Sequence, residues 1–322
     1  MNNNLNPKTL TLILPESVAN LRIDQALSQQ LPEYSRTQIK QWIDQGDILL
    51  NGQRIAAKTK VKGGEEVSIT IIPPEPLTNE AQDIPLNIVF EDEHVLIIDK
   101  PVGLVVHPGA GNSDRTLLNA LLHYHPPLTH LPRAGILHRL DKDTSGLLMI
   151  AKTTTALQSL GKQLDARTLV REYQAVVYGP LISGGTVQAA IDRHPLNRKR
   201  MAVVETGKPA VTHYRVAERF RYHTHLNLKL ETGRTHQIRV HMAHIRHPIV
   251  GDAAYGGRVK LGKNMTEELI QSLRQFKRQA LHAFALGFSH PITKEFIRVT
   301  SELPDDINAL LTALRHDQKV NS

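Results

Sequence analysis

The stretch Gly135–Gly146, GILHRLDKDTSG, runs directly into LLMIAK over residues 147–152. Its polar and ionisable residues lie between two short apolar runs, with a glycine at each edge. This pattern predicts a loop presented by two buried strands, the kind of position where scaffolds carry chemistry. Asp141 and Asp143 stand in it among a histidine, an arginine, a lysine and two hydroxyls. The alternative is a polar turn in which one of residues 143–145 only caps a helix.

Length and composition fit a soluble protein with one large domain and a smaller module. The chain has 322 residues, of which 40% are hydrophobic and 22% are charged. Its formal net charge of +8 favours an acidic partner, nucleic acid first. The absence of cysteine excludes disulfides, thiolate zinc sites, iron–sulfur clusters and a cysteine nucleophile. No signal-peptide pattern and no run of ~18 apolar residues is found, so the sequence predicts a cytoplasmic protein without a membrane segment.

Residues 19–73 show the pattern of two helices followed by a hairpin. Residues 35–38 read as a capping box that opens the second helix, and Asn51-Gly52 is a tight-turn signal between a strand at residues 48–50 and the return strand that starts at residues 53–55. This order, with Arg36 and Lys40 on the second helix, resembles the RNA-binding module called the S4 domain. The resemblance implies that these two cations contact RNA.

The remaining boundaries follow from composition. Residues 1–18 are predicted to be a flexible lead with a possible short strand at 9–14, and residues 74–83 a proline-stiffened linker. Residues 84–322 form the second domain. Its strands outnumber its crossover helices, and several are joined by short turns. The expected fold is therefore α+β, with a large mixed, mainly antiparallel sheet flanked by helices.

A cationic run at residues 192–200 lies between two predicted strands. Arg193, Arg198, Lys199 and Arg200 are candidates for contacts with an RNA backbone, because phosphate neutralisation dominates affinity for nucleic acid.

Four histidines raise the question of a metal site. His236, His241, His244 and His247 lie on or next to a predicted helix over residues 236–245, which Thr235 would cap. Their spacings of five and three residues spread them around the helix, and arginines stand between them. A zinc site needs ligands that converge on one face. The sequence therefore predicts no metal site.

A paired-carboxylate glycosidase built on Asp141 and Asp143 is a second possibility. The neighbouring arginine and lysine would hold both carboxylates ionised, whereas a general acid needs a raised pKa. The surroundings favour one carboxylate that works as an ionised nucleophile.

The segment His138–Gly146 resembles the signature of the pseudouridine synthases that modify large-subunit ribosomal RNA. Three further motifs match in the family's order: Lys100–Gly103 with His107-Pro108, Arg171–Ala175, and Thr232–Val240. With the S4-like module, the resemblance covers about residues 19–300.

The resemblance implies that Asp141 is the catalytic aspartate. The reaction breaks the N1–C1′ bond of a uridine, turns the uracil and rejoins it through C5. Whether the carboxylate adds to C6, attacks C1′ or removes a ribose proton is left open. Arg239 matches the arginine that pairs with this aspartate and keeps it ionised. Tyr173 matches a tyrosine packed on the uracil, and it is the candidate to shuttle the C5 proton.

The resemblance also implies a substrate-binding set. Ile238 would form the apolar floor under the base, and His138 would bind substrate beside it. Arg139 would fill the space that the flipped base vacates, since a guanidinium can both stack on bases and bind phosphate. Asp143 would support the loop.

The implied substrate is 23S ribosomal RNA or its assembly precursor, at the stem-loop near the decoding centre. An isomerisation needs no cofactor or metal, and a monomer is the default state. The competing hypothesis is a non-catalytic RNA-binding ribosome-assembly factor, which would keep the S4-like module and the cationic run. It would not need Asp141, Tyr173 and Arg239 together.

Overall fold

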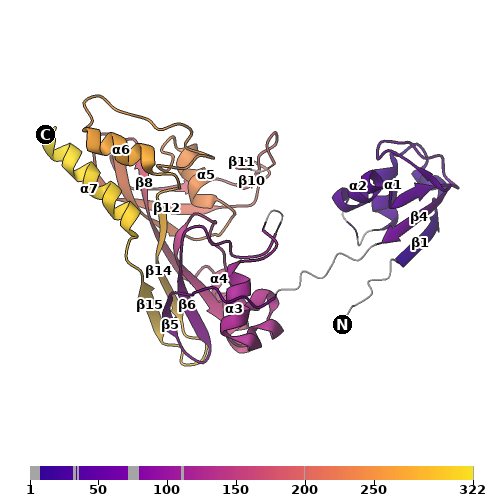
Figure 1. The fold of residues 1–322 in the computed structure, drawn as a ribbon, viewed down its shortest axis with the longest axis horizontal. Coiled ribbons are helices and arrows are strands. Elements are labelled where there is room, and N and C mark those ends of the chain that lie inside the picture. Colours follow the sequence, from indigo (N-terminus) through magenta and orange to yellow (C-terminus); the bar gives the residue numbers. More distant parts are fainter. Residues whose placement is uncertain are drawn as a thin grey trace. The chain divides into compact units, whose positions relative to one another are not determined.

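The part of the chain that this computed structural model describes comprises residues 8–31, 34, 36–71, 80–109, 112–198 and 200–321. These residues fall into two units, one within residues 1–78 and one within residues 79–322, and each has its own apolar core. Figure 1 shows the elements of both units.

The first unit packs two helices on a four-stranded antiparallel sheet with the order β1-β4-β2-β3. Side chains from both helices and from the sheet, including Leu27, Trp42 and Ile69, form its core. The elements are β1 (Lys8–Ile13), the 3-10 helix η1 (Glu16–Val18), α1 (Ile23–Gln30), α2 (Arg36–Gln45), β2 (Ile48–Leu50), β3 (Gln53–Arg54) and β4 (Glu66–Ile71).

The start of this unit contains the short strand that the sequence indicated as possible at residues 9–14, and the strand lies at residues 8–13. Residues 8–13 pair along the whole of β4, which makes β1 an integral strand of the sheet. A six-residue segment next to a proline gives a weak local signal, and the pairing partner lies more than 50 residues away in sequence. The predicted capping residue Ser35 and most of the predicted linker lie outside the described residues. Gln82, at the end of that linker, bonds to Asn119 of the second unit.

The second unit is built on a nine-stranded sheet with the order β5-β6-β7-β14-β8-β13-β12-β9, and β15 pairs with β14. The β7–β14 pair is parallel, and the other described ladders of this sheet are antiparallel, which confirms the predicted mixed, mainly antiparallel sheet. The strands are β5 (Ile88–Glu91), β6 (Val95–Lys100), β7 (Ser145–Ala151), β8 (Val170–Tyr178), β9 (Gly185–Gln188), β12 (Val211–Arg219), β13 (His223–Leu230), β14 (Leu281–Ser289) and β15 (Phe296–Thr300).

Helices and a separate hairpin complete this unit. The cationic run lies on a two-stranded ribbon, with Arg193 in its first strand and Arg198 and Arg200 between its two strands. Among the described helices, none is long and apolar enough to cross a membrane. The elements are α3 (Leu117–Tyr124), the 3-10 helices η2 (Pro126–His130) and η3 (Pro132–Gly135), α4 (Thr154–Asp165), β10 (Ile191–Arg193), β11 (Met201–Val203), α5 (Gln237–His244), α6 (Glu267–Gln275) and α7 (Asp305–Val320).

Strand β7 follows the loop that carries Asp141, and it is buried along its whole length. Leu148 and Ile150 belong to the main core, while Leu147 and Met149 pack in a second cluster with α4. A strand covered on both faces reads as a continuous apolar run, which explains the sequence LLMIA. The C-terminal end of the loop is therefore fixed by a strand that is buried at every residue.

The apolar run before the loop is not a strand, so the prediction of two strands around the loop is wrong on this side. Ile136 makes only an isolated bridge to Ile150. Gly135 ends η3 with φ +74°, and a Cβ at this position would lie 1.9 Å from the carbonyl oxygen of Ala151. Because glycine has no Cβ, the backbone of this run can pack directly against β7 without forming a strand ladder with it.

Candidate functional site

A pocket of about 680 Å³ lies where the Asp141 loop meets β8 and the start of α5. It contains every residue of the proposed catalytic and substrate-binding set: His138, Arg139, Asp141, Tyr173, Ile238 and Arg239. Its rim is strongly basic, with further arginines at positions 133, 167, 171 and 234. Such a lining suits an anionic polymer such as RNA.

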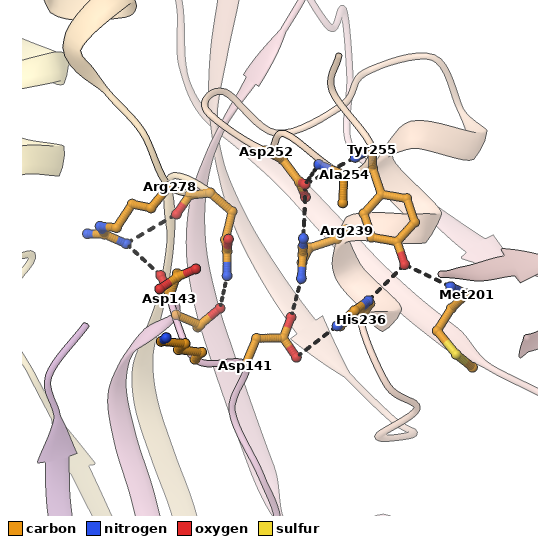
Figure 2. A network of polar contacts seen from close by, with 12 residues as sticks. Asp141, Asp143, Met201, His236, Arg239, Asp252, Ala254, Tyr255 and Arg278 are labelled. Atoms are coloured by element: carbon orange, nitrogen blue, oxygen red, sulfur yellow. Dashed lines mark hydrogen bonds and ion pairs between the residues drawn. The ribbon is translucent and has the colours of Figure 1, made fainter. Parts of the chain in front are cut away.

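Figure 2 shows the chain of ion pairs at the centre of this pocket. Arg239 Nη1 donates to Asp141 Oδ2 at 2.9 Å, and the same guanidinium donates to both oxygens of Asp252 at 2.7 and 2.9 Å. The Asp252 side chain is fully buried, and it also accepts from the backbone N–H groups of Ala254 and Tyr255. Asp252 therefore fixes the guanidinium that faces Asp141.

The charge state of Arg239 follows from these contacts. Burial by itself would lower the pKa of Arg239, but the carboxylates of Asp252 and Asp141 more than offset it and raise that pKa. The guanidinium stays charged and lies 2.9 Å from the carboxylate of Asp141.

Tyr173 projects from β8 into the pocket and is 6% exposed. Burial raises the pKa of Tyr173, the guanidinium of Arg171 lowers it, and Asp141 raises it. The phenol is therefore protonated at neutral pH. Arg171, two residues before it on the same face of β8, is itself buried and donates to the carbonyl of Glu231 at 3.1 Å.

The three predicted substrate-binding residues lie in different surroundings. Arg139 is exposed at the pocket, and Ile238 is buried in the first turn of α5. The imidazole of His138 accepts from the Met149 N–H at 3.3 Å, and burial lowers the pKa of His138 to about 3. His138 is therefore neutral and joins the pocket wall to β7.

The side chains of two buried cations, Lys100 and Arg278, bind backbone carbonyls in and beside the Asp141 loop. The ammonium of Lys100, whose side chain is fully buried, donates to the carbonyls of Pro101, Leu104 and Lys142 at 2.7, 3.0 and 3.0 Å. Arg278 donates to the carbonyl of Asp143 at 3.3 Å. The loop is thus held mainly through its backbone.

Lys100 gives a pH-dependent prediction. Burial lowers the pKa of Lys100 from 10.5 to about 8 in the folded protein, and Asp143 and Asp141 oppose the shift. Between these two pH values the unfolded chain binds more protons, so the wild type gains stability as pH rises. Relative to Lys100→Met, the free energy of unfolding of the wild type should rise by about 3 kcal/mol across this window. Urea unfolding of both proteins from pH 7 to 11 measures it, and parallel curves would contradict the buried-ammonium interpretation.

Candidate RNA contacts outside the pocket occur in each of the two units. In the first unit, the Arg36 guanidinium pairs with buried Asp24 at 2.8 Å, while Lys40 is exposed. Arg193, Arg198 and Arg200 are exposed on the β10–β11 hairpin. The fourth cation of this run, Lys199, lies outside the described residues.

The histidines after residue 235 bind separate partners. His241 contacts Thr212 and the Ala189 carbonyl, and His247 contacts the Tyr178 carbonyl. No group of three or more histidine, aspartate or glutamate side chains suited to a metal ion occurs among the residues with described positions.

Three residues of the central network were missed by the sequence analysis: His236, Asp252 and Tyr255. Tyr255 Oη lies 2.8 Å from His236 Nδ1 and accepts from the Met201 N–H at 2.9 Å, and the Arg239 guanidinium lies over its ring. The loop that holds Asp252 and Tyr255 has no periodic pattern. Its only signal is an ionisable residue after Gly251, which is too common to be specific.

Comparisons with known proteins identify two families in this chain. A family described as S4 domain matches residues 21–67, and one described as RNA pseudouridylate synthase matches residues 94–244. A protein of Xylella fastidiosa (strain Temecula1), named ribosomal large subunit pseudouridine synthase D, is 55% identical over 304 residues, which cover 94% of this chain and 92% of that protein. This chain belongs to the RNA pseudouridylate synthase family.

Two further relatives are also named ribosomal large subunit pseudouridine synthase D. The proteins of Xanthomonas campestris pv. campestris and Escherichia coli (strain K12) are each 53% identical, and they cover 95% and 96% of this chain and 92% and 95% of their own lengths. Among solved structures, human RNA pseudouridylate synthase domain containing 4 matches with a TM-score of 0.57 and 26% identity, over 71% of this chain and 93% of that one. The synthase is an enzyme of the isomerase class with an N-terminal S4 domain.

Proposed function

We propose that this synthase converts specific uridines of large-subunit ribosomal RNA to pseudouridine, at the 23S rRNA stem-loop near the decoding centre. The substrate class is supported by relatives at 53–55% identity that are named for the large ribosomal subunit. The basic pocket and the net charge of +8 are in keeping with it.

The observation that carries the chemistry is the Asp141–Arg239 ion pair inside a pocket that also holds Tyr173. One carboxylate oxygen is bound by the guanidinium, which leaves the other to react. Addition to C6, attack at C1′ and removal of a ribose proton all need an ionised and positioned carboxylate. Any of the three leads to cleavage of the N1–C1′ bond, rotation of the uracil and a new C1′–C5 bond.

Loss of the C5 proton completes the isomerisation. Tyr173 packs against the base and relays this proton, in a site where burial keeps the phenol neutral at the outset. Before it can take the C5 proton, the phenol gives up its own proton, and the product uracil gains one proton at N1, so the proton count balances. Arg171 lowers the pKa of Tyr173 and so favours this transient phenolate. Ile238 forms the apolar floor of the pocket under the base, and His138 forms part of the pocket wall.

The target base reaches Asp141 by leaving its stack, at a cost of about a few kcal/mol. Arg139, exposed at the pocket, enters the vacated space and offsets part of this cost by stacking and phosphate contact. Arg193, Arg198, Lys199 and Arg200 of the cationic run at residues 192–200 contact the RNA backbone.

The remaining proposals concern setting and organisation. The synthase works in the cytoplasm as a monomer, without cofactor or metal, because the isomerisation gains no group and changes no oxidation state. Residues 19–73 form the S4 domain, residues 74–83 the linker, and residues 84–322 the catalytic domain.

The test uses in-vitro-transcribed large-subunit rRNA. After incubation with the protein, carbodiimide-dependent reverse-transcription stops mark pseudouridine. New stops in the stem-loop near the decoding centre are expected. Stops elsewhere in the rRNA would contradict the target, and no new stops on either the free rRNA or an assembling large-subunit particle would contradict the function.

Deletion of residues 1–75 tests the role of the S4 domain. The catalytic unit keeps its own core without this segment, so we expect apparent rRNA affinity to fall about tenfold or more, as phosphate contacts are lost. The single-turnover rate at saturating enzyme should change much less. Filter binding and single-turnover assays measure the two quantities, and unchanged affinity would count against an RNA role for the domain.

A further inference from the structure

His236 occupies a strained backbone position at the start of α5. The sequence predicts that Thr235 caps this helix, but His236 is the N-cap, with φ 56° and ψ 21° and without a side-chain cap bond. A left-handed conformation at a residue other than glycine costs about 1–2 kcal/mol and persists only where other contacts hold it. The imidazole is 24% exposed and lines the pocket.

The contacts of Tyr255 decide which nitrogen of His236 carries the proton. The Met201 N–H can only donate, so Tyr255 Oη accepts from it at 2.9 Å. The Tyr255 hydroxyl then needs an acceptor for its own proton, and His236 Nδ1 lies 2.8 Å away. A neutral imidazole that accepts at Nδ1 has its proton on Nε2.

His236 is neutral in this setting. Burial is the main cause that lowers the pKa of His236, and Arg239 and Arg139 lower it further, against Asp141 and Asp252. His236 Nε2 lies 3.7 Å from Asp141 Oδ1, and Figure 2 marks this contact with a dashed line. This separation is too long for a hydrogen bond, so Oδ1 keeps its lone pairs, whereas Oδ2 is bound by Arg239.

We propose that His236 is a positioning residue that acts through Asp141: with its Nε2–H fixed by Tyr255, it sets the plane of the carboxylate so that Oδ1 is the oxygen presented to the uridine. This inference rests on the proposed function. Arg239 binds one oxygen directly, whereas the Nε2–H dipole of His236 attracts the other across 3.7 Å without a hydrogen bond. A partial rotation of the carboxylate about its Cβ–Cγ bond would otherwise turn the free oxygen away from the uridine; a half-turn changes nothing, because the two oxygens are equivalent.

Two amide substitutions separate positioning from structure. The amide N–H of His236→Gln replaces Nε2–H, so it keeps a donor toward Asp141. His236→Asn tolerates the left-handed backbone and can keep the bond to Tyr255, but it has no donor toward Asp141. If positioning is the role, His236→Asn lowers the single-turnover rate about 10- to 100-fold and His236→Gln retains most of it, since small misplacements carry costs of this size. A merely structural role reverses this order.

The assay uses the full chain, in-vitro-transcribed large-subunit rRNA and saturating enzyme, with rRNA affinity measured in parallel. Exposed His244 on the same helix provides the control, and His244→Ala should behave as the wild type. Tyr255→Phe removes the hydroxyl that fixes the tautomer without changing the strained residue, and it should lower the rate at unchanged affinity.

Each outcome is informative. An equal loss in both amide variants, a loss of rRNA affinity in place of rate, or full activity of Tyr255→Phe overturns the positioning role while wild-type activity leaves the proposed function intact. No pseudouridine from the wild type overturns the proposed function and this inference with it.

Discussion

Asp141→Asn is expected to lower the rate of pseudouridine formation by at least about 10³-fold, the scale on which loss of a nucleophile or base acts. Asparagine keeps the shape of the side chain and a carbonyl oxygen for Arg239. It loses the charge that all three candidate first steps require. The fold should persist, because Arg239 retains its two bonds to Asp252. Carbodiimide mapping of large-subunit rRNA measures the rate, and filter binding should show rRNA affinity within about twofold of the wild type.

Asp143→Asn is the matched control for this result. Both aspartates lie in the same loop, but Arg278 contacts the backbone carbonyl of Asp143, which the substitution leaves in place. We expect this variant to keep activity within about tenfold of the wild type, a loss of less than 1.5 kcal/mol in the barrier. Undiminished stops from Asp141→Asn, or equal losses in the two variants, would show that the carboxylate of Asp141 is not the reacting group.

The central ion pair could be predicted only through motif resemblance. Asp141 and Arg239 are 98 residues apart in sequence, and their local patterns show a polar loop and a helix surface. The structure places them 2.9 Å apart, and their part in catalysis remains a prediction. Local secondary-structure propensity cannot predict this distance. The distance is set by the packing of β7 and α5 in one apolar core.

The residues that support the ion pair could not be predicted from local pattern. Asp252 is buried because Arg239 neutralises it, and that reason exists only in the folded chain. His236 adopts a left-handed backbone that no propensity favours for histidine. Strand β1 is an intermediate case, because its sequence indicated only a possible strand and its pairing with β4 fixes the structure. By contrast, β7 could be predicted, because a strand that is buried on both faces needs a continuous run of apolar residues.

Arg239 should carry the second large effect, and this effect has two separable parts. Arg239→Met leaves the fully buried carboxylate of Asp252 without a cation, which should cost about 3–5 kcal/mol in the free energy of unfolding. It also removes the partner of Asp141, so pseudouridine formation should fall by about 10²-fold or more. Urea unfolding and single-turnover assays measure the two parts.

The double variant Arg239→Met with Asp252→Asn tells these parts apart. Neutralising Asp252 removes the uncompensated buried charge, and the amide oxygen can still accept from the N–H groups of Ala254 and Tyr255. Stability should therefore recover in large part. Activity should not, because Asp141 still lacks the guanidinium that holds Oδ2 in place. If activity returned together with stability, Arg239 would serve only to neutralise Asp252, and the reacting carboxylate would need no cation beside it.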